Sequence, residues 1–359
     1  MRRSGGGLCS PAVGWVRRGL ECSASLAAVG TGLLFAVSLV LIVASAEGFT
    51  NAVEWAGFRL HLGAGATGSL LAAIGTAMPE TVVPAVALLS HQPKSEAVAI
   101  GAILGAPFLL VTVAVAITGA AVVLRGGERL LRLDPPQVRR DLGTFVVGYS
   151  LVLLSLAFPR PLRVLVSLVL MGLYARYVVA TLRGGEATEE APEPLHLLRW
   201  RGRAHDPRMA AVVVQLLASV LALVVGGEIF VSALSQASAA LGVSALLLAL
   251  VVVPLATELP EILNAVLWVR SGDDRLAFGC IAGAAAFQAC FLGAMGLSFT
   301  AWQPRGIGLA AAPITLVTAG AVLVVVRGGR SRGWTLGLAA LPWFGWVVAA
   351  VLLRPGAAA

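Results

Sequence analysis

Two five-residue motifs combine the same chemical groups at the same spacing, TAMPE at residues 76–80 and TELPE at residues 257–261. In each, a threonine lies four residues before a glutamate, so that on a helix the hydroxyl and the carboxylate share one face. The proline cannot donate a hydrogen bond to the carbonyl four residues earlier, which leaves that carbonyl oxygen free. Carboxylate, hydroxyl and carbonyl oxygens together suit Ca²⁺ or Na⁺ better than a soft metal. The predicted cation ligands are therefore Glu80, Glu261, Thr76, Thr257 and the carbonyl oxygens of Gly75 and Ala256.

Both glutamates lie inside apolar stretches, where an ionised carboxylate costs about 3 kcal/mol or more if the stretch spans a membrane. A single such glutamate is as often structural as functional: its side chain can reach to the helix end, or it can be protonated and hydrogen-bonded in the core. Two in matched motifs favour a functional site. Glu258 lies three residues before Glu261 and adds a third carboxylate, unless it pairs with an arginine or faces water. Gln288 is a further candidate ligand through its amide oxygen, with a core hydrogen bond as the equal alternative.

The elements that hold these residues are predicted to be membrane-spanning helices. Of the 359 residues, 58% are hydrophobic and only 12% are charged, and the mean hydropathy is +0.90. Soluble domains carry about 25% charged residues. A spanning helix needs about 20 mainly apolar residues, and these runs are too long and uniform for barrel strands. The ten predicted spans are residues 26–48, 64–90, 97–124, 142–158, 161–182, 209–233, 240–269, 275–299, 306–326 and 334–353.

The net charge of +8 does not indicate nucleic-acid binding, because most arginines lie in short loops between apolar runs. Arginines in such loops set the orientation of a membrane protein. Four loops are the richest in arginine: 125–141, 183–208, 270–275 and 327–332. The positive-inside rule places these loops in the cytoplasm and both termini outside. Four N-terminal arginines favour the opposite orientation: Arg2, Arg3, Arg17 and Arg18.

The two halves of the chain resemble each other. The two motifs are 181 residues apart, as are Glu47 and Glu228. Downstream, residues 99–105 match residues 277–283 at an offset of 178, with glycines at the same places. Three matches in order indicate an internal duplication. Glu47 and Glu228 are weaker candidates for a vestibule or gate, and carboxylates in headgroup water are at least as plausible.

Topology follows from counting the spans. The longest polar stretch falls near the middle, with five predicted spans on each side. An odd number of spans makes the second repeat enter the membrane from the opposite side, and inverted repeats are typical of secondary transporters. We predict an all-α polytopic membrane protein of about ten transmembrane helices in two inverted five-helix repeats. Its predicted parts are an N-terminal segment (1–25), a first repeat (26–182), a polar linker (183–208) and a second repeat (209–359).

Segments 63–124 and 240–299 resemble the paired α-repeats of the sodium/calcium exchanger (cation/Ca²⁺ antiporter) superfamily. A family repeat carries a G-T-S-L-P-E block followed by G-N-x-x-G-S-N-x-F-N/D. This chain has AIGTAMPETV with AIGAILGAP, and LATELPEIL with AFGCIAGAAAFQ. The resemblance implies ten helices in two inverted repeats, with alternating access to a central cation site. It also implies roles for four residues: Ca²⁺ binding by Glu80 and Glu261, and Na⁺ binding by Thr76 and Thr257.

The chain departs from the family pattern at several oxygen ligands. In the first repeat, alanine replaces a serine at positions 77 and 106, Pro107 replaces an asparagine, and Leu110 stands at the late Asn or Asp position. The corresponding residues of the second repeat are Glu258, Ala284, Ala285 and Gln288. With fewer ligands the site holds fewer ions or exchanges a cation for protons, and Glu258 is the residue that compensates.

The function expected from the sequence is antiport of Ca²⁺ against Na⁺. Two alternatives stay open, a cation/proton antiporter on the same scaffold and a degenerate relative that transports nothing. An enzyme is not expected, because the sequence has no HExxH, GxSxG or zinc-binding Cys/His pattern. The expected partners are inorganic cations and the lipid bilayer, with Ca²⁺ and Na⁺ as transported ions and no cofactor. Lys94 is the only lysine among 26 basic residues, a bias typical of GC-rich bacterial genomes, so we expect a bacterial inner membrane.

Overall fold

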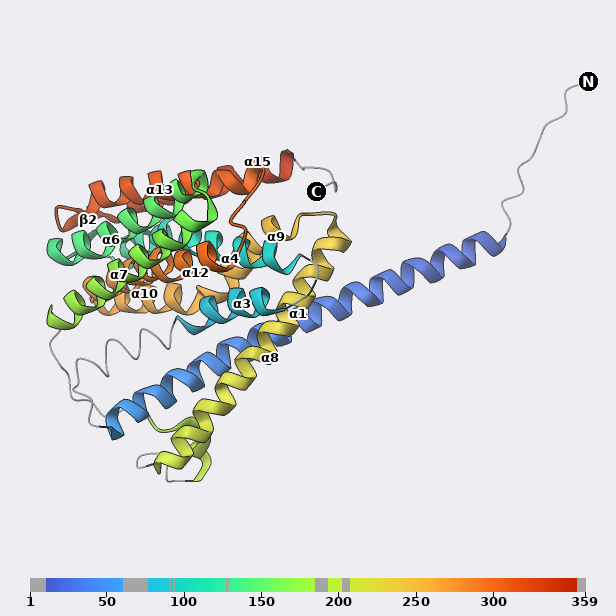
Figure 1. Cartoon of the computed structure of the whole chain (residues 1–359), viewed down its shortest axis with the longest axis horizontal. Helices are drawn as coiled ribbons and strands as arrows, with labels where there is room; N and C mark the ends of the chain where they lie inside the picture. Colours follow the sequence, from blue (N-terminus) through green and yellow to red (C-terminus); the bar gives the residue numbers. More distant parts are fainter. Residues whose placement is uncertain are drawn as a thin grey trace, which may run out of the picture.

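The computed structural model describes residues 11–60, 77–90, 92, 94–126, 129–184, 193–201 and 207–353. Nearly all of this chain is helical (Figure 1). The α-helices are α1 (Pro11–Arg59), α3 (Met78–Leu89), α4 (Ser95–Leu109), α5 (Val115–Leu124), α6 (Pro135–Leu154), α7 (Arg160–Gly184), α8 (Met209–Leu241), α9 (Ala245–Thr257), α10 (Leu259–Ser271), α11 (Asp274–Phe287), α12 (Gly293–Phe299), α13 (Ile307–Val326), α14 (Gly333–Gly337) and α15 (Leu341–Leu352). The shorter elements are the π-helices η2 (Leu110–Ala114) and η5 (Gln288–Leu292), the 3₁₀ helices η3 (Ser155–Ala157), η4 (His196–Arg201) and η6 (Leu338–Ala340), and the strands β1 (Leu130–Arg132) and β2 (Arg330–Arg332).

The predicted membrane spans correspond to helices. In the described part of the chain, eight helices are long and apolar enough to cross a membrane. The pair α9 and α10 is bent by 44° at its break and makes a ninth span if the two helices are counted as one. One predicted span remains, residues 64–90, and only its second half is described, as α3. The first helix begins at Pro11 and not near residue 26, so it includes much of the predicted N-terminal segment.

The duplication read from the sequence is also present in the backbone. The π-helices η2 and η5 begin at Leu110 and Gln288, which are 178 residues apart, the offset found in the sequence. Each π-helix interrupts a long helix between two α-helical parts, α4 with α5 and α11 with α12. A π-helical turn inside an α-helix is uncommon and is frequent at functional sites. Its recurrence at matched positions shows that the two halves share local structure.

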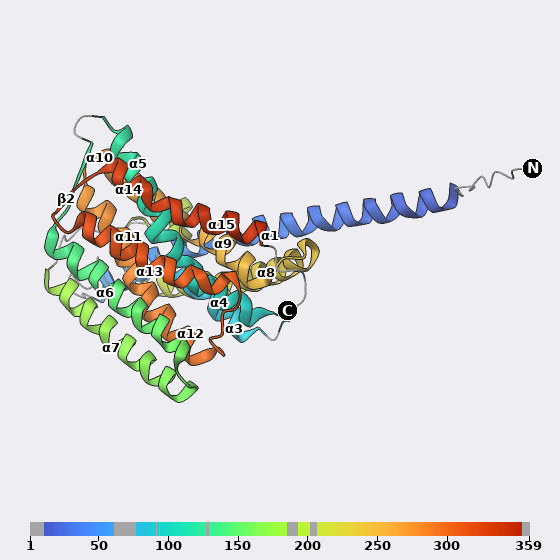
Figure 2. The same ribbon diagram turned by 90° about the horizontal axis from the view of Figure 1, so that it is seen from above.

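The arrangement separates a crossed helix pair from a central bundle. The carboxy-terminal part of α1 packs against α8, and the amino-terminal part of α1 extends away from the bundle in both views (Figures 1 and 2). The span formed by α4, η2 and α5 lies at the centre, and 89% of its most apolar stretch is buried. Outer helices expose large apolar side chains, as at Leu168 of α7 and Phe344 of α15. Lipid is the solvent that accepts such surfaces.

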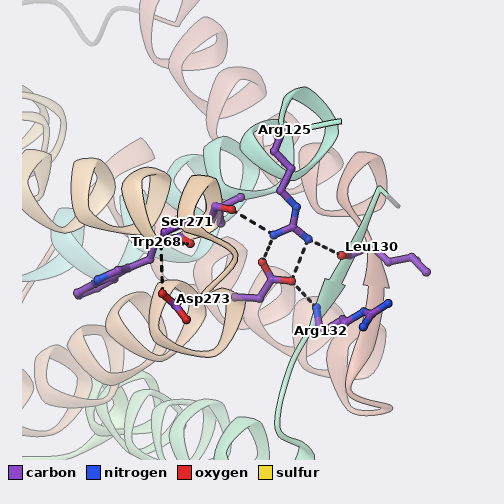
Figure 3. A network of polar contacts seen from close by, with 8 residues as sticks. Arg125, Leu130, Arg132, Trp268, Ser271 and Asp273 are labelled. Carbon is purple, nitrogen blue, oxygen red and sulfur yellow. Dashed lines mark hydrogen bonds and ion pairs between the residues drawn. The ribbon is translucent and has the colours of Figure 1, made fainter. Parts of the chain in front are cut away.

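Three of the four arginine-rich loops meet at one end of the bundle. Strand β1 follows α5 and pairs antiparallel with β2, which follows α13, with Leu131 opposite Ser331. The guanidinium of Arg125 binds both carboxylate oxygens of Asp274, at 3.1 Å for Nη2–Oδ2, and the carbonyl oxygen of Val269 at 3.1 Å (Figure 3). The grouping of these loops on one side, inferred from counting spans, is therefore present in the fold.

The described part of the polar linker is attached to α1. The carbonyl oxygen of Glu193 accepts hydrogen bonds from Nδ2 of Asn51 at 3.1 Å and from Nε1 of Trp55 at 2.7 Å. The amide oxygen of Gln215 on α8 accepts a 2.7 Å bond from the backbone nitrogen of Leu197. Within this linker, residues 196–201 form η4 and dock between α1 and α8.

Candidate cation-binding site

Each of the two motif glutamates lies just inside the start of a helix. In the second motif the chain breaks between two helices: α9 ends at Thr257, and Glu258 precedes α10, with φ −89° and ψ −1°. Ala77, its counterpart 181 residues earlier, precedes α3 with φ −79° and ψ 6°. Each motif proline falls in the first turn of the following helix, where its missing N–H removes no hydrogen bond. Glu80 and Glu261 therefore lie in the first turn, where the helix dipole favours negative charge.

This break corrects one sequence prediction. Thr257 and Glu261 were expected to share one face of a continuous helix, but Thr257 ends α9 and Glu261 belongs to α10. The Thr257 side chain is 1% exposed, and its hydroxyl donates to the carbonyl oxygen of Val253 at 3.2 Å. Ala256 is buried in the last turn of α9. Thr76 and Gly75, the corresponding candidates of the first motif, lie outside the described residues.

Glu80 and Glu261 line the same cavity, which has a volume of about 380 Å³. Neither side chain faces lipid, since Glu80 is 2% and Glu261 is 4% exposed. The two carboxyl groups interact electrostatically with each other and with Glu258. Among the described residues that line the cavity, none is Arg, Lys or His. The structure therefore brings the two matched glutamates to one cavity, and no basic side chain of the described lining balances their charge.

Several oxygens at the site have no protein partner. In the described part of the chain, both carboxylate oxygens of Glu80 and Oε2 of Glu261 are buried without a hydrogen bond. Buried polar atoms are nearly always paired, and a bound cation is one way to pair them. The described residues contain no group of three or more His, Cys, Asp or Glu side chains arranged to hold a metal ion. A cation here must therefore complete its coordination with amide, hydroxyl or carbonyl oxygens or with water.

Glu258 is held by Gln288 and not by an arginine or water. Its side chain is 0% exposed, and Oε1 accepts a 2.9 Å hydrogen bond from Nε2 of Gln288. Neither residue is among those that line the cavity. Oε2 of Glu258 and Oε1 of Gln288 have no partner in the described structure. Among the described residues, the partner of Glu258 is therefore Gln288 and not an arginine, and the side chain does not reach the surface.

Other candidates lie away from the site. Glu47 on α1 and Glu228 on α8 are exposed and are not among the cavity-lining residues. Further polar residues line the cavity, among them Gln137, Tyr177, Asn264 and Cys280. Asn264 lies three residues after Glu261 and was predictable from helical spacing. Cys280 lies in the repeated segment 277–283, whereas Gln137 and Tyr177 come from α6 and α7, and no spacing in the sequence relates these two to the motifs.

Comparison with known proteins gives a family and a fold. The sequence matches the family model described as "Sodium/calcium exchanger protein" over residues 31–183 and 211–353. No curated protein matches it. A solved structure titled as the H⁺/Ca²⁺ exchanger CAX is similar with a TM-score of 0.69 and 18% identity, covering 91% of this chain and 82% of the other.

Two further structures show the same fold. Native YfkE is similar with a TM-score of 0.65 and 15% identity, covering 93% of this chain and 96% of the other. The sodium-calcium exchanger NCX_Mj is similar with a TM-score of 0.56 and 16% identity, covering 91% and 99%. At these identities the similarity establishes the arrangement of helices and no more.

Proposed function

Because the chain belongs to the sodium/calcium exchanger protein family, it is an integral membrane cation antiporter and not an enzyme, and we propose that it exchanges Ca²⁺ against H⁺. Glu80 and Glu261 hold the Ca²⁺ ion in the cavity that they share, and the cavity opens alternately to the two sides of the membrane. The single observation that carries this proposal is the position of these two glutamates. They come from matched motifs, lie in the first turns of α3 and α10, and line one cavity.

Charge supports a divalent cargo. Removing a carboxylate from water costs several kcal/mol unless an opposite charge compensates it. The two cavity glutamates carry up to two negative charges with no basic side chain among the described lining residues. One Ca²⁺ ion balances two carboxylates, and carboxylate oxygens are ligands that Ca²⁺ prefers.

The coupling ion favoured by the geometry is a proton. A Na⁺ ion needs a shell of oxygen ligands, but the family's serine and asparagine positions in the second repeat are Ala284 and Ala285. A proton needs only one oxygen, and the buried carboxylates supply several. Glu258 adds a third acidic group that interacts electrostatically with Glu80 and Glu261. An acid-rich site that is poor in neutral oxygen ligands suits H⁺ better than Na⁺.

Antiport against Na⁺, the first expectation from the sequence, is the second candidate. It is supported by Thr257, which is buried next to Glu258 at the position of a family threonine that helps to bind Na⁺. Its hydroxyl donates to Val253, which leaves the oxygen lone pairs available as an acceptor.

The architecture proposed for this activity is a pair of inverted repeats. In this proposal residues 26–182 and 209–359 form the two repeats and 183–208 the linker, and the matched π-helices and the matched starts of α3 and α10 support this division. The proposed location is a bacterial inner membrane, with the arginine-rich loops on the cytoplasmic side. The cavity lining reaches Leu182 and Leu276, which flank two of these loops, so the described conformation faces that side.

The test is uptake of radioactive Ca²⁺ into proteoliposomes that contain the purified full-length protein. An outward H⁺ gradient and an outward Na⁺ gradient are imposed in separate experiments. The variant Glu261→Gln removes one proposed ligand. The matched control is Glu228→Gln, which makes the same chemical change at an exposed glutamate outside the cavity.

Uptake that is driven by H⁺, lost in Glu261→Gln and kept in Glu228→Gln is the result that we expect. Uptake driven only by Na⁺ would replace the proposed coupling ion by the second candidate. No Ca²⁺ uptake under either gradient would contradict Ca²⁺ antiport and support the reading of a non-transporting relative.

A further inference from the structure

Three polar side chains of α6 and α7 form a hydrogen-bonded group in the cavity wall. Asp141 on α6 is 2% exposed, and its Oδ1 accepts a 2.8 Å hydrogen bond from Nε of Arg140. The side chains of Tyr177 on α7 and Gln137 on α6 lie next to the same carboxylate, with polar groups that can donate to it. Tyr177 and Gln137 line the cavity, whereas Asp141 is not among its lining residues. Asp141 therefore fixes two neutral polar groups on the cavity surface.

Glycines of α11 make room for these two side chains. A Cβ atom on Gly279 would lie 2.4 Å from Nε2 of Gln137, and one on Gly283 would lie 3.2 Å from the hydroxyl of Tyr177. The corresponding glycines of the first repeat, residues 101 and 105, instead face the backbone of α9. The same glycine spacing thus allows close helix packing in one repeat and admits polar side chains in the other.

These side chains lie on the route from the mouth of the cavity to the glutamates. Trp268 lines the cavity seven residues beyond Glu261 on α10, roughly 10 Å along the helix axis. Leu276, at the start of α11, also lines the cavity and is 55% exposed, so the mouth is at this end. Going inward along α11, Gln137 is reached at Gly279 and Tyr177 one helical turn later at Gly283.

The group has the chemistry of a site for a hydrated cation. The Tyr177 hydroxyl interacts with the side chains of Asp141 and Thr181, and the second lone pair of its oxygen is available to accept from a water ligand of a cation. Ca²⁺ takes about six to eight oxygen ligands, several of which are water in solution. We propose that Tyr177 and Gln137, positioned by Asp141, bind a hydrated divalent cation before it reaches Glu80 and Glu261. This inference rests on the proposed function, since it assumes that the glutamates bind the cation.

Asp141 also neutralises a positive charge that lies beside the cation route. The guanidinium carbon of Arg140 lies 5.8 Å from the ring centroid of Tyr177 and so close to the route. Its charge is paired with Asp141 at 2.8 Å. Replacing Asp141 by a neutral residue would leave an unpaired positive charge beside an incoming cation. Asp141 is thus a positioning residue that also neutralises Arg140.

The first test compares the rate of Ca²⁺ association with the equilibrium affinity in the purified full-length protein. Rapid-filtration binding of radioactive Ca²⁺ gives both quantities. In Tyr177→Phe we expect association and dissociation to slow by a similar factor, about tenfold for one lost polar contact, with Kd nearly unchanged. The matched control is Tyr149→Phe, because Tyr149 is a buried tyrosine of α6 that is not among the cavity-lining residues.

The second test concerns the charge of Arg140. Asp141→Asn should slow Ca²⁺ association, and raising the ionic strength should partly restore the rate because salt screens the exposed positive charge. The double variant Arg140→Gln/Asp141→Asn should recover part of the loss without added salt. A purely structural role for Asp141 would show neither the salt dependence nor the recovery.

The outcomes separate this inference from the proposed function. If the wild type binds Ca²⁺ and Tyr177→Phe associates as fast as Tyr149→Phe, the cation site in the cavity wall is refuted while the proposed function stands. A large loss of equilibrium affinity in Tyr177→Phe with an unchanged association rate would also refute it. If the wild type binds no Ca²⁺, the proposed function fails and this inference fails with it.

Discussion

Glu258 accepts a buried 2.9 Å hydrogen bond from Gln288, which connects the break between α9 and α10 to the first residue of the π-helix η5. The corresponding positions of the first repeat are Ala77 and Leu110, which are both apolar. The side chains next to the cavity are therefore asymmetric between the two repeats, although the backbone there is repeated. The second repeat has a hydrogen-bonded polar pair where the first repeat has two apolar residues.

This pairing predicts a non-additive effect on stability. Glu258→Ala should destabilise the protein by about 1–3 kcal/mol, because it leaves the buried amide of Gln288 without its acceptor. The double variant Glu258→Ala/Gln288→Leu copies the first repeat and should recover much of the loss. Thermal unfolding in detergent measures both. Losses that add in the double variant would contradict a specific pair.

Two glycines at matched positions should respond differently to alanine. A Cβ on Gly101 would lie 2.5 Å from the backbone oxygen of Leu246, which cannot move without shifting α9. A Cβ on Gly279 would meet the flexible end of Gln137. We expect Gly101→Ala to cost about 2 kcal/mol or more by overpacking and Gly279→Ala much less. Equal shifts of the unfolding temperature would show that the two contacts do not differ in this way.

The ion pair between Arg125 and Asp274 should stabilise one end of the bundle. Asp274 is 4% exposed, so Asp274→Asn leaves a largely buried guanidinium without its charge partner and should cost about 3 kcal/mol. Asp273→Asn is the matched control, since the neighbouring aspartate is exposed and bonded only within its turn to Ser271. Chemical unfolding of the purified protein would decide. A similar small effect of both variants would mean that the pair contributes little.

Cys280 provides a native reporter of access to the cavity. It lines the cavity, whereas Cys290, ten residues later, is buried at 0% exposure. With Cys9 and Cys22 replaced by serine, a small water-soluble thiol reagent should modify Cys280 and not Cys290. Saturating Ca²⁺ should slow the reaction, because the cation fills the space beside the thiol. Mass spectrometry of the labelled peptides identifies the site, and labelling that Ca²⁺ does not affect would place the ion elsewhere.

Local sequence patterns were enough to predict the spans and the repeat, and they single out two glutamates that the structure brings to one cavity. Apolar length reports a membrane span directly, and the offset of 178 read from residues 99–105 recurs in the two π-helices. The helix break at Glu258 was not predicted, because a proline is compatible with either a kink or a new helix. The motif itself does not distinguish the two.

Contacts between distant segments could not be read from the sequence. Gln288 was recognised as a polar residue in an apolar span, but its partner Glu258 depends on how α11 packs against α10. Tyr177 and Gln137 reach the cavity because two glycines of α11 leave space opposite them. Such complementarity between helices is a property of the packed bundle.

The central claim is that Glu80 and Glu261 bind Ca²⁺ together, and equilibrium binding of Ca²⁺ to the purified protein tests it most directly. Each of Glu80→Gln and Glu261→Gln should weaken binding by about 100-fold, since each loses a charged ligand worth about 3 kcal/mol in a water-poor site. Glu228→Gln should bind as the wild type does. Wild-type affinity in either cavity variant would show that the two glutamates do not form the cation site.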